Sequence, residues 1–467
     1  MNREIFRQYD IRGVWEKDLT EEVALLIGRA FGSLLEETLQ KDRIEVSVGR
    51  DVRLSSPAIS SSLISGIIST GVNVVDIGAC PTPVQYFSIH SLGLDGGVMV
   101  TGSHNPPEYN GFKLSVGTGT IHGEGIQRIR EIISAGSFRQ GSGALREYPA
   151  LRDYVAHLLS SFSSLSGITV VLDAGNGTAG LCAPEIAEGL GARVIRLYCE
   201  PDGRFPNHHP DPVLPENIEK LIQTVKETGA DIGIAYDGDA DRIGVVDADG
   251  EIVWGDRLMI VFSREILRES PGASIIGEVK CSQLLYDDIK KHGGNPVMWK
   301  TGHSLIKAKM KETGALIAGE MSGHIFFADR YFGYDDAIYA TLRLLEILKK
   351  KGGPFRIREA LNDLPEVFST PEIRFDCSDS LKFRVVERIR DAFSGYDVNT
   401  TDGARIHFSD GWALARASNT QPALVLRFEA WDEKALSRIR SLVEEELGLI
   451  MKSLTADKDN GPAGGSA

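Results

Sequence analysis

Three segments of the sequence place reactive side chains directly after short apolar runs. The first is TGSHNP, which follows the run GGVMV and sets the hydroxyl of Ser103 beside the imidazole of His104. An apolar run of this length is typical of a buried strand, and a strand that ends here would present both groups at a sheet edge. An ordinary surface turn is the alternative, since Ser, Asn, Gly and Pro are common turn residues.

The second segment is DGDADR, which follows the apolar run IGIAY. Asp237, Asp239 and Asp241 stand at alternate positions, so their carboxylates can converge on a hard cation that prefers oxygen ligands. An EF-hand is excluded, because its sixth position requires glycine and its twelfth glutamate, whereas this chain has Arg242 and Ala248. Magnesium commonly completes a three-carboxylate shell with water or a phosphate oxygen. The segment therefore predicts a metal site, with a solvated acidic turn as the alternative.

The third segment is GEMSGH at residues 319–324, after the run ALIA. Glu320 and Ser322 could accept and donate hydrogen bonds to sugar-like hydroxyls. His324 could move a proton near neutral pH. Loop glutamates and histidines are also common on surfaces, so the segment alone does not distinguish a site from a loop.

Cations and phosphate-binding groups occur in further loops. Residues 416–422, RASNTQP, offer a guanidinium, two hydroxyls, an amide side chain and successive backbone N–H groups, which together could hold a phosphate. An ordinary turn is again the alternative. Arg12 precedes a glycine in YDIRG, and three lysines lie in or near strand-end loops: Lys113, Lys280 and Lys300. In a chain of formal net charge −14, cations placed there would focus an anionic ligand.

The elements that must position these groups alternate between strands and helices. Residues 20–40 carry a helical apolar stripe with Thr20 as N-cap, a strand follows at 44–49, and a helix begins at Ser56-Pro57. This alternation predicts parallel-rich α/β structure. It restarts after a Gly/Ser-rich linker at 134–150 and again near residue 255.

The chain is therefore expected to form three α/β domains and a different last domain. The predicted boundaries are 1–148 for the domain that contains TGSHNP, 149–252 for the domain that contains DGDADR, 253–363 for the domain that contains GEMSGH, 364–454 for the domain that contains RASNTQP, and 455–467 for a disordered tail. In each α/β third two strands end in polar loops. Because ligands bind at the carboxyl ends of strands in open α/β sheets, three such units would build one large cleft.

Length, net charge and cysteine content limit the kinds of protein that this chain could be. A chain of 467 residues is too long for one core. The charge of −14 argues against nucleic acid or an anionic membrane as partner. Five scattered cysteines without a CxxC pair argue against a disulfide framework and a zinc site, and favour a reducing compartment. The polar N-terminus is no signal peptide, and no run of about 18 apolar residues could span a bilayer.

Taken together and in order, five segments resemble one family. YDIRG, TGSHNP, DGDADR, GEMSGH and RASNTQP are similar to the motifs of the α-D-phosphohexomutases, specifically the bacterial phosphomannomutase/phosphoglucomutase branch. The resemblance covers residues 4–452. It implies four domains around a central cleft, three of them mixed α/β domains of similar topology and the fourth a smaller α+β domain like the TATA-binding protein.

The resemblance also implies roles for individual residues. Ser103 would carry a phosphoryl group, and Asp237, Asp239 and Asp241 would hold Mg²⁺ with a phosphoserine oxygen as the remaining ligand. The further catalytic residues implied are Arg12, His104, Lys113 and His324. The substrate-binding residues implied are Tyr9, Arg242, Lys280, His303, Glu320, Ser322, Arg416, Ser418, Asn419 and Thr420.

The activity implied is movement of phosphate between O6 and O1 of mannose or glucose, through a hexose 1,6-bisphosphate that also serves as activator. A cytoplasmic monomer whose partners are small sugar phosphates is expected. Met321 resembles the mannose/glucose enzymes, since glucosamine mutases usually have Gln there. Phosphoglucosamine mutase and a phosphoserine-type sugar phosphatase are the alternatives. A non-catalytic sugar-phosphate-binding protein is disfavoured, because Ser103 and all three aspartates are retained.

Overall fold

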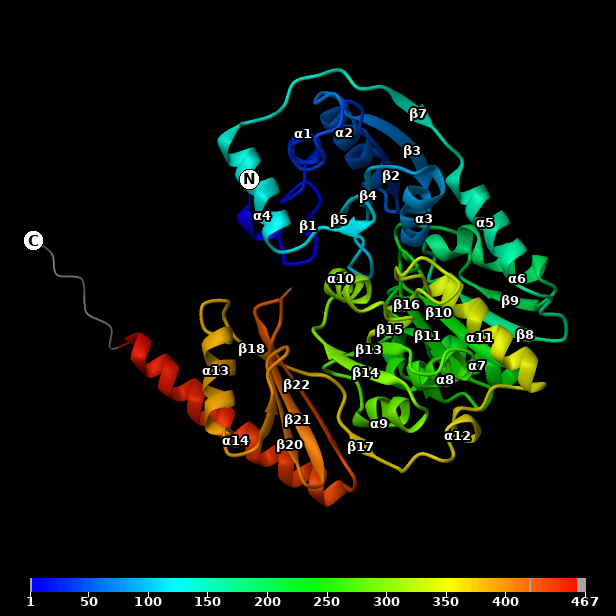
Figure 1. Ribbon diagram of the computed structural model, residues 1–467, viewed down its shortest axis with the longest axis vertical. Coiled ribbons are helices and arrows are strands. Elements are labelled where there is room, and N and C mark those ends of the chain that lie inside the picture. The colour runs from blue at the N-terminus through cyan, green and yellow to red at the C-terminus, as the bar shows by residue number, and fades with distance from the viewer. Residues whose placement is uncertain (1, 420, 460–467) are drawn as a thin grey trace, which may run out of the picture. The chain divides into compact units, whose positions relative to one another are not determined.

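The computed structural model describes residues 2–419 and 421–459, with side chains as far as residue 454. The chain forms two compact units. We call Met1–Gly277, Leu285–Val297 and Gly302–Leu361 the first unit, and Glu278–Leu284, Met298–Thr301 and Asn362–Ala467 the second unit. Three of the four sheets belong largely or wholly to the first unit, and the fourth belongs to the second (Figure 1).

The first sheet has seven strands in the order β1-β5-β4-β2-β3-β7, with β6 paired to β5. Its strands are β1 (Ile11–Val14), β2 (Glu45–Arg50), β3 (Asn73–Ala79), β4 (Gly96–Val100), β5 (Tyr109–Val116), β6 (Gly119–Thr120) and β7 (Leu145–Glu147). Strands β2 and β4 are parallel, with Arg50 opposite Val100. The loops that follow these two strands therefore start side by side.

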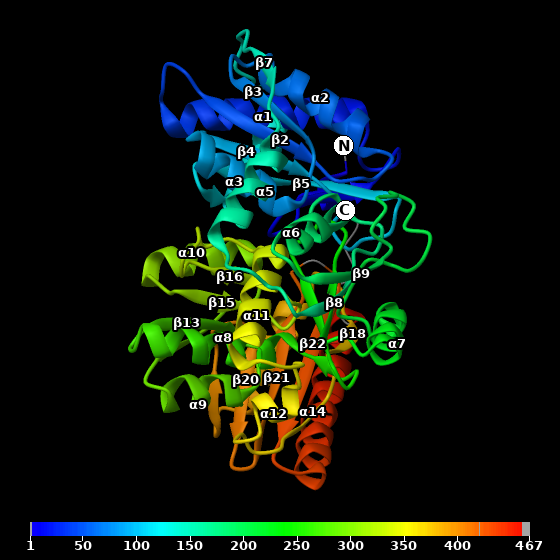
Figure 2. The same cartoon turned by 90° about the vertical axis from the view of Figure 1, so that its right-hand side faces the viewer.

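The helices of this part are η1 (Arg3–Ile5), α1 (Glu21–Leu39), α2 (Ser56–Ile68), α3 (Thr82–Leu92) and α4 (Glu124–Ala135). Thr20 caps α1 by accepting a hydrogen bond from Val23 N at 3.2 Å. Helices α1 and α2 cross so closely that a Cβ on Gly66 would collide with the carbonyl of Leu25. The two helices lie beside the sheet (Figure 2). Their buried Ile and Leu side chains, with Phe31 of α1, share one core with residues of β2 and β4.

The second sheet has the order β12-β11-β10-β8-β9. Its strands are β8 (Thr169–Asp173), β9 (Arg193–Leu197), β10 (Ile232–Tyr236), β11 (Ile243–Asp247) and β12 (Ile252–Val253), and its helices are α5 (Ala150–Ser161), η2 (Thr178–Leu181), α6 (Ala183–Gly189), η3 (Pro215–Asn217) and α7 (Glu219–Thr228). Strands β8 and β10 are parallel, whereas β10 and β11 are antiparallel. The segment DGDADR is thus the connection of a hairpin.

The third sheet has the order β14-β13-β15-β16. Its strands are β13 (Ser274–Glu278), β14 (Asn295–Trp299), β15 (Ile317–Gly319) and β16 (Ile325–Phe327), and its helices are α8 (Gly255–Glu269), α9 (Gln283–Lys291), α10 (His303–Thr313), α11 (Ala337–Lys351) and α12 (Ile357–Ala360). All three α/β sheets share one topological feature. A parallel strand turns back into an antiparallel neighbour, as β4 into β5, β10 into β11 and β15 into β16, and the connection carries the predicted site loop.

The sheet of the second unit has the order β17-β22-β21-β20-β19, with β18 paired to β22, and its pairings are antiparallel. Its strands are β17 (Phe368–Ser369), β18 (Ile373–Asp376), β19 (Asp397–Asn399), β20 (Ala404–Phe408), β21 (Gly411–Ala417) and β22 (Ala423–Ala430), and its helices are α13 (Lys382–Ala392) and α14 (Glu433–Asp459). Both helices pack against the sheet and enclose a separate apolar core (Figure 1).

Three mixed α/β sheets and one antiparallel sheet agree with the predicted fold class. The predicted domain boundaries and the arrangement around a cleft stay predictions. Two details differ from the sequence analysis. The linker 134–150 contains β7, which pairs with β3, and α14 continues to Asp459, inside the segment predicted as a tail. Among the described residues, none of the helices combines the length and apolar character needed to cross a membrane.

Candidate active site

Ser103 lies buried in the loop that follows β4, with 2% of its surface exposed. Its Oγ donates to Asp237 Oδ2 at 2.9 Å and lies 3.2 Å from His104 Nδ1. Its backbone has a φ of 49°, in the left-handed region that L-residues rarely adopt. The hydroxyl is therefore held between two groups that could accept its proton, on a backbone that surrounding contacts must stabilise.

Those contacts come from Arg53, in the loop after β2, which is almost completely buried. Its Nη2 donates to the carbonyls of Ser103 at 2.8 Å and Asn105 at 2.6 Å, and its Nη1 donates to Tyr109 O at 3.0 Å and to Pro106 O. Its Nε donates to Asp51 Oδ2 at 3.0 Å. One guanidinium thus fixes four carbonyls around Ser103. The sequence analysis predicted the strand at 44–49 that precedes this loop but assigned no role to Arg53.

The three aspartates of DGDADR are fully buried, and one oxygen from each lies within 4.8 Å of the others. Asp237 Oδ1 accepts from the backbone N–H groups of Asp241 and Arg242, both at 3.1 Å. The loop approaches Ser103 closely, because an added Cβ on Gly238 would lie 2.5 Å from the Ser103 carbonyl. Only glycine allows this approach.

Three buried carboxylates close together repel one another, so a cation nearby would stabilise this cluster. Burial and the neighbouring carboxylates of Asp239 and Asp241 raise the pKa of Asp237 well above its usual value. Lys113 supplies one cation, with its Nζ 2.7 Å from Asp239 and 2.5 Å from Asp241. Burial alone would lower the pKa of Lys113, but these two carboxylates raise it well above its usual value. Lys113 lies within β5 and not in a strand-end loop.

The cluster also fits a metal ion. Asp239 Oδ1 and Asp241 Oδ1 are buried without a hydrogen-bond partner, which is unfavourable unless a cation accepts these lone pairs. An all-oxygen donor set suits a hard divalent cation. Asp241, His324 and Asp335 form a second group of the same compactness, but one of its three donors is an imidazole nitrogen, which suits a hard cation less well than a carboxylate oxygen does. The aspartate trio is therefore the better metal site.

Thr82, at the start of α3, is a site residue that the sequence analysis missed. Its Oγ1 donates to Asp239 Oδ2 at 2.6 Å, and its N–H donates to the Asp239 carbonyl at 2.9 Å. The first sheet thereby contacts the metal loop through both Ser103 and Thr82.

The GEMSGH loop is joined to the same hairpin. Ile243 N donates to Gly323 O at 3.0 Å, and Arg242 Nε donates to His324 Nε2 at 2.9 Å. Gly323 has a φ of 88°, and a Cβ there would collide with the Ile243 carbonyl. Glycine in this motif is therefore required by the close approach of the two loops.

His324 is surrounded by charged groups. Its Nδ1 lies 3.2 Å from Asp335 and 3.6 Å from Asp241. Its ring stacks on His303, with centroids 5.8 Å apart. Burial, followed by the nearby Lys307, holds the pKa of His303 well below its usual value, so this imidazole is neutral. Asp335 and Lys307 were not predicted, although Lys307 stands four residues after His303, a spacing that places both on one face of a helix such as α10.

The remaining predicted residues of the first unit border these groups. Arg12 donates to Asn105 Oδ1 at 2.6 Å and pairs with Asp10 at 2.5 Å. The Tyr9 ring meets His303 edge-on at 6.4 Å. Glu320 Oε1 accepts from Gly302 N at 2.7 Å, and half-buried Ser322 follows on the same loop.

His104 is neutral, because burial, followed by the charges of Arg242 and Arg12, places its pKa well below the usual value. A neutral imidazole 3.2 Å from a hydroxyl can take up or return its proton. Ser103 therefore has both a proton acceptor and a carboxylate cluster suited to a cation, which is the environment expected of an oxygen nucleophile.

The other predicted residues belong to the second unit. Arg416 Nε donates to Asp402 Oδ2 at 3.0 Å, and Ser418 Oγ accepts from Gln421 N at 3.1 Å. Lys280 Nζ pairs with Glu372 at 3.1 Å, and Asn419 follows Ser418 after β21. Thr420 lies outside the described residues. Lys300 is exposed.

The five cysteines, all within the described part of the chain, form no disulfide, in agreement with the sequence analysis.

Models of one family match the chain in four parts. The phosphoglucomutase/phosphomannomutase alpha/beta/alpha domain I matches residues 3–140, domain II residues 152–250, domain III residues 254–368 and the C-terminal domain residues 372–446.

Similar proteins match over nearly the whole chain. A phosphomannomutase/phosphoglucomutase of Pseudomonas aeruginosa is 48% identical over 96% of this chain and 96% of its own length. A phosphoglucomutase of Neisseria gonorrhoeae is 44% identical over 94% of this chain and 96% of its own. The crystal structure of a phosphoglucomutase/phosphomannomutase family protein from Burkholderia thailandensis has a TM-score of 0.90 and 44% identity, and covers 97% of this chain and 98% of its own.

Proposed function

Because the chain belongs to the phosphoglucomutase/phosphomannomutase family, we propose that it moves a phosphoryl group between O6 and O1 of a hexose phosphate, with Ser103 as the carrier. One observation carries the proposal. The Ser103 hydroxyl is buried at the end of a strand, 2.9 Å from a carboxylate of a three-aspartate cluster and 3.2 Å from a neutral imidazole.

In the first half of the proposed reaction, a free sugar hydroxyl attacks the phosphorus of phospho-Ser103. The P–Oγ bond breaks, the sugar oxygen loses its proton, and Ser103 Oγ gains one to become the hydroxyl again. His104 is placed to return that proton. Phosphoryl transfer depends mainly on positioning and charge stabilisation, which Arg12, Lys113 and Arg242 supply.

Asp237, Asp239 and Asp241 would hold Mg²⁺, which neutralises charge on the transferring group when bound. The orphaned Oδ1 atoms of Asp239 and Asp241 support this assignment. The phosphoserine formed at Ser103 would supply the remaining ligand.

The product of the first half is a 1,6-bisphosphate, and its second phosphate must return to Ser103 Oγ. The sugar therefore binds in two orientations, and its far phosphate needs one fixed site. We assign that site to Arg416, Ser418, Asn419 and Thr420, with Lys280 beside them. Tyr9, His303, Glu320 and Ser322 would contact hydroxyls that both orientations share, and His324 is a second candidate for proton transfer.

The proposed sugars are mannose and glucose. The Pseudomonas relative is named for both activities and the Neisseria relative for glucose alone. The resemblance of the Met321 loop to the mannose/glucose enzymes agrees with these names. We further propose that the protein is a cytoplasmic monomer and that hexose 1,6-bisphosphate activates it. Phosphoglucosamine mutase and a sugar phosphatase are the alternatives that the assay must separate.

The test is the Ser103→Ala variant together with phosphopeptide mass spectrometry of the wild-type protein. We expect phosphate on Ser103 and loss of nearly all mutase activity in the variant, measured with mannose 1-phosphate, glucose 1-phosphate and glucosamine 1-phosphate in parallel. Ser134→Ala, at an exposed helix serine, is the control and should keep activity. Full activity in Ser103→Ala contradicts the mechanism, and inorganic phosphate as the main product indicates a phosphatase.

A further inference from the structure

The loop that follows β13 belongs to the second unit, although its strand belongs to the third α/β sheet. Two buried arginines of the second unit bind its backbone. Arg405 Nη1 donates to Val279 O at 2.6 Å and to Cys281 O at 2.8 Å, and Arg427 Nη1 donates to Lys280 O. Three successive carbonyls are thereby fixed to β20 and β22. The backbone of Lys280 is part of the second unit.

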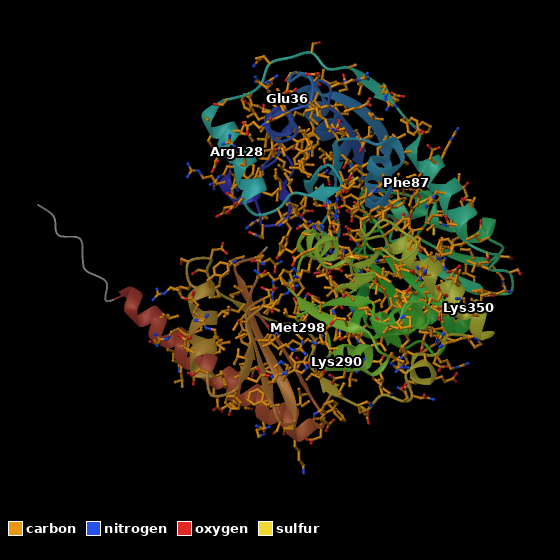
Figure 3. The ribbon with its side chains drawn as sticks, viewed as in Figure 1. Glu36, Phe87, Arg128, Lys290, Met298 and Lys350 are labelled. Carbon is orange, nitrogen blue, oxygen red and sulfur yellow. The ribbon has the colours of Figure 1, made fainter. Side chains whose placement is uncertain are left out.

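Aromatic packing reinforces the attachment. The Arg405 guanidinium lies 3.8 Å from the centroid of the Trp412 ring, whose Nε1 donates to Glu429 Oε1 at 2.9 Å. The same carboxylate oxygen accepts from Gln283 N at 3.0 Å. Trp412 also packs with Val279, Leu414 and half-buried Met298, which Figure 3 labels.

A chain of side-chain contacts, with one link through the backbone N–H of Thr301, then runs through the second unit from Arg416 to Lys280. Arg416 Nε donates to Asp402 Oδ2 at 3.0 Å, and the same oxygen accepts from Thr301 N at 3.1 Å. Thr301 Oγ1 donates to Glu278 Oε2 at 2.5 Å. Glu278 Oε1 lies 3.5 Å from Lys280 Nζ.

The chain is well placed to orient both cations. Glu278 is fully buried, and the side chains of Lys280 and Arg416 are 9% and 6% exposed. A carboxylate on Nε fixes the plane of a guanidinium and hence the direction of its Nη donors. Lys280 also meets Glu372 at 3.1 Å, and its charge, against the effect of burial, lowers the pKa of that carboxyl to about 2. Lys280 is therefore held between two carboxylates, those of Glu278 and Glu372.

We propose that Glu278, Thr301 and Asp402 are positioning residues that hold Lys280 and Arg416 as one phosphate-binding pair within the second unit. This inference rests on the proposed function, which assigns the far phosphate to Arg416 and Lys280. The new element is that Lys280, which lies far from Arg416 in the sequence, is coupled to Arg416 through Thr301.

The test uses Thr301→Val, which removes the hydroxyl and keeps the shape of the side chain. Loss of a hydrogen bond to a carboxylate should lower kcat/KM for glucose 1-phosphate about tenfold, mainly through KM, because the pair binds a phosphate that does not react. Thr301→Ser should restore most of the loss. Thr370→Val is the control, since Thr370 makes a comparable side-chain bond to Phe428 N in the same unit at 3.2 Å.

Double mutants separate positioning from a general structural effect. If Thr301 acts through Lys280, Thr301→Val should cost little more in a Lys280→Met background, and the same should hold for Asp402→Asn in an Arg416→Gln background. Fully additive losses, or a valine variant with wild-type KM, overturn the positioning role while leaving the phosphate site intact. If Lys280→Met and Arg416→Gln themselves leave kcat/KM unchanged, the phosphate site of the proposed function is wrong, and the coupling with it.

Discussion

At the scale of single residues, the buried carboxylates of Asp237, Asp239 and Asp241 are the main argument for a bound cation. Asp239 pairs with Lys113 and accepts from Thr82, and its other oxygen has no hydrogen-bond partner. We expect Asp239→Asn to lower turnover by about a hundredfold, since it removes one charge from a site that stabilises charge. Removal of metal with EDTA should abolish wild-type turnover, and added Mg²⁺ should restore it.

The matched control is Asp249→Asn, at an aspartate whose side chain is 52% exposed and which pairs with Arg356. It should change turnover little, because exposed ion pairs contribute weakly. An Asp239→Asn variant with wild-type turnover and an unchanged requirement for Mg²⁺ would mean that the loop is only a turn.

The sequence identified the residues that stand in short motifs and missed those that only folding brings near. Ser103 and the three aspartates were predicted from strand-end loops, and the structure brings them together. Thr82, Asp335 and Lys307 lie outside these motifs, and only tertiary contacts reveal them. Lys113 was predicted in or near a strand-end loop, but it projects from within β5, because the β4–β5 hairpin returns toward the cluster.

At the scale of elements, the site depends on the close approach of two connections, β4–β5 and β10–β11. Gly238 allows it, since a Cβ there would lie 2.5 Å from the Ser103 carbonyl. Gly238→Ala should separate the serine from the carboxylates and lower turnover by about a hundredfold, because a shift of about 1 Å at a reacting group has an effect of this size.

Gly395→Ala is the control for this prediction, because no atom lies within 4 Å of the added Cβ. Steady-state kinetics and the fraction of protein phosphorylated on Ser103 are the measurements. Wild-type turnover in Gly238→Ala would show that the two connections tolerate separation.

Elements with strong periodicity were the best predicted. The helix predicted at 20–40 agrees closely with α1, since it combines an apolar stripe with an N-cap at Thr20, whereas α14 continues into the segment predicted as a tail. Strand β7 was missed inside the predicted linker, because all three of its residues are exposed and give no alternating pattern. The membership of the β13 loop in the second unit could not be predicted, because it depends on arginines more than a hundred residues later in the chain.

At the scale of the whole molecule, five motifs predicted the family, and four family models confirm it. The two units also have separate apolar cores. Ile439, on α14, is fully buried in the core of the second unit. We expect Ile439→Ala to destabilise that unit by about 2–5 kcal/mol. Hydrogen exchange followed by mass spectrometry should then show faster exchange in β20–β22 and little change in β2–β4.

Leu442→Ala, on the same helix but 38% exposed, is the control and should have a smaller effect. Equal acceleration in both sets of strands would show that the two units unfold together.

The capture of the β13 loop by Arg405 and Arg427 has a consequence for recombination between relatives. A chimera that takes only residues 362–454 from this chain would combine these arginines with the β13 loop of a relative. Their N–H groups would then face backbone carbonyls whose positions depend on the relative's sequence. A graft that also carries residues 278–301 transfers the arginines together with their acceptors. Binding of the far phosphate by Lys280 and Arg416, if it is to be transplanted between homologues, should therefore require two separate pieces of the chain and not one.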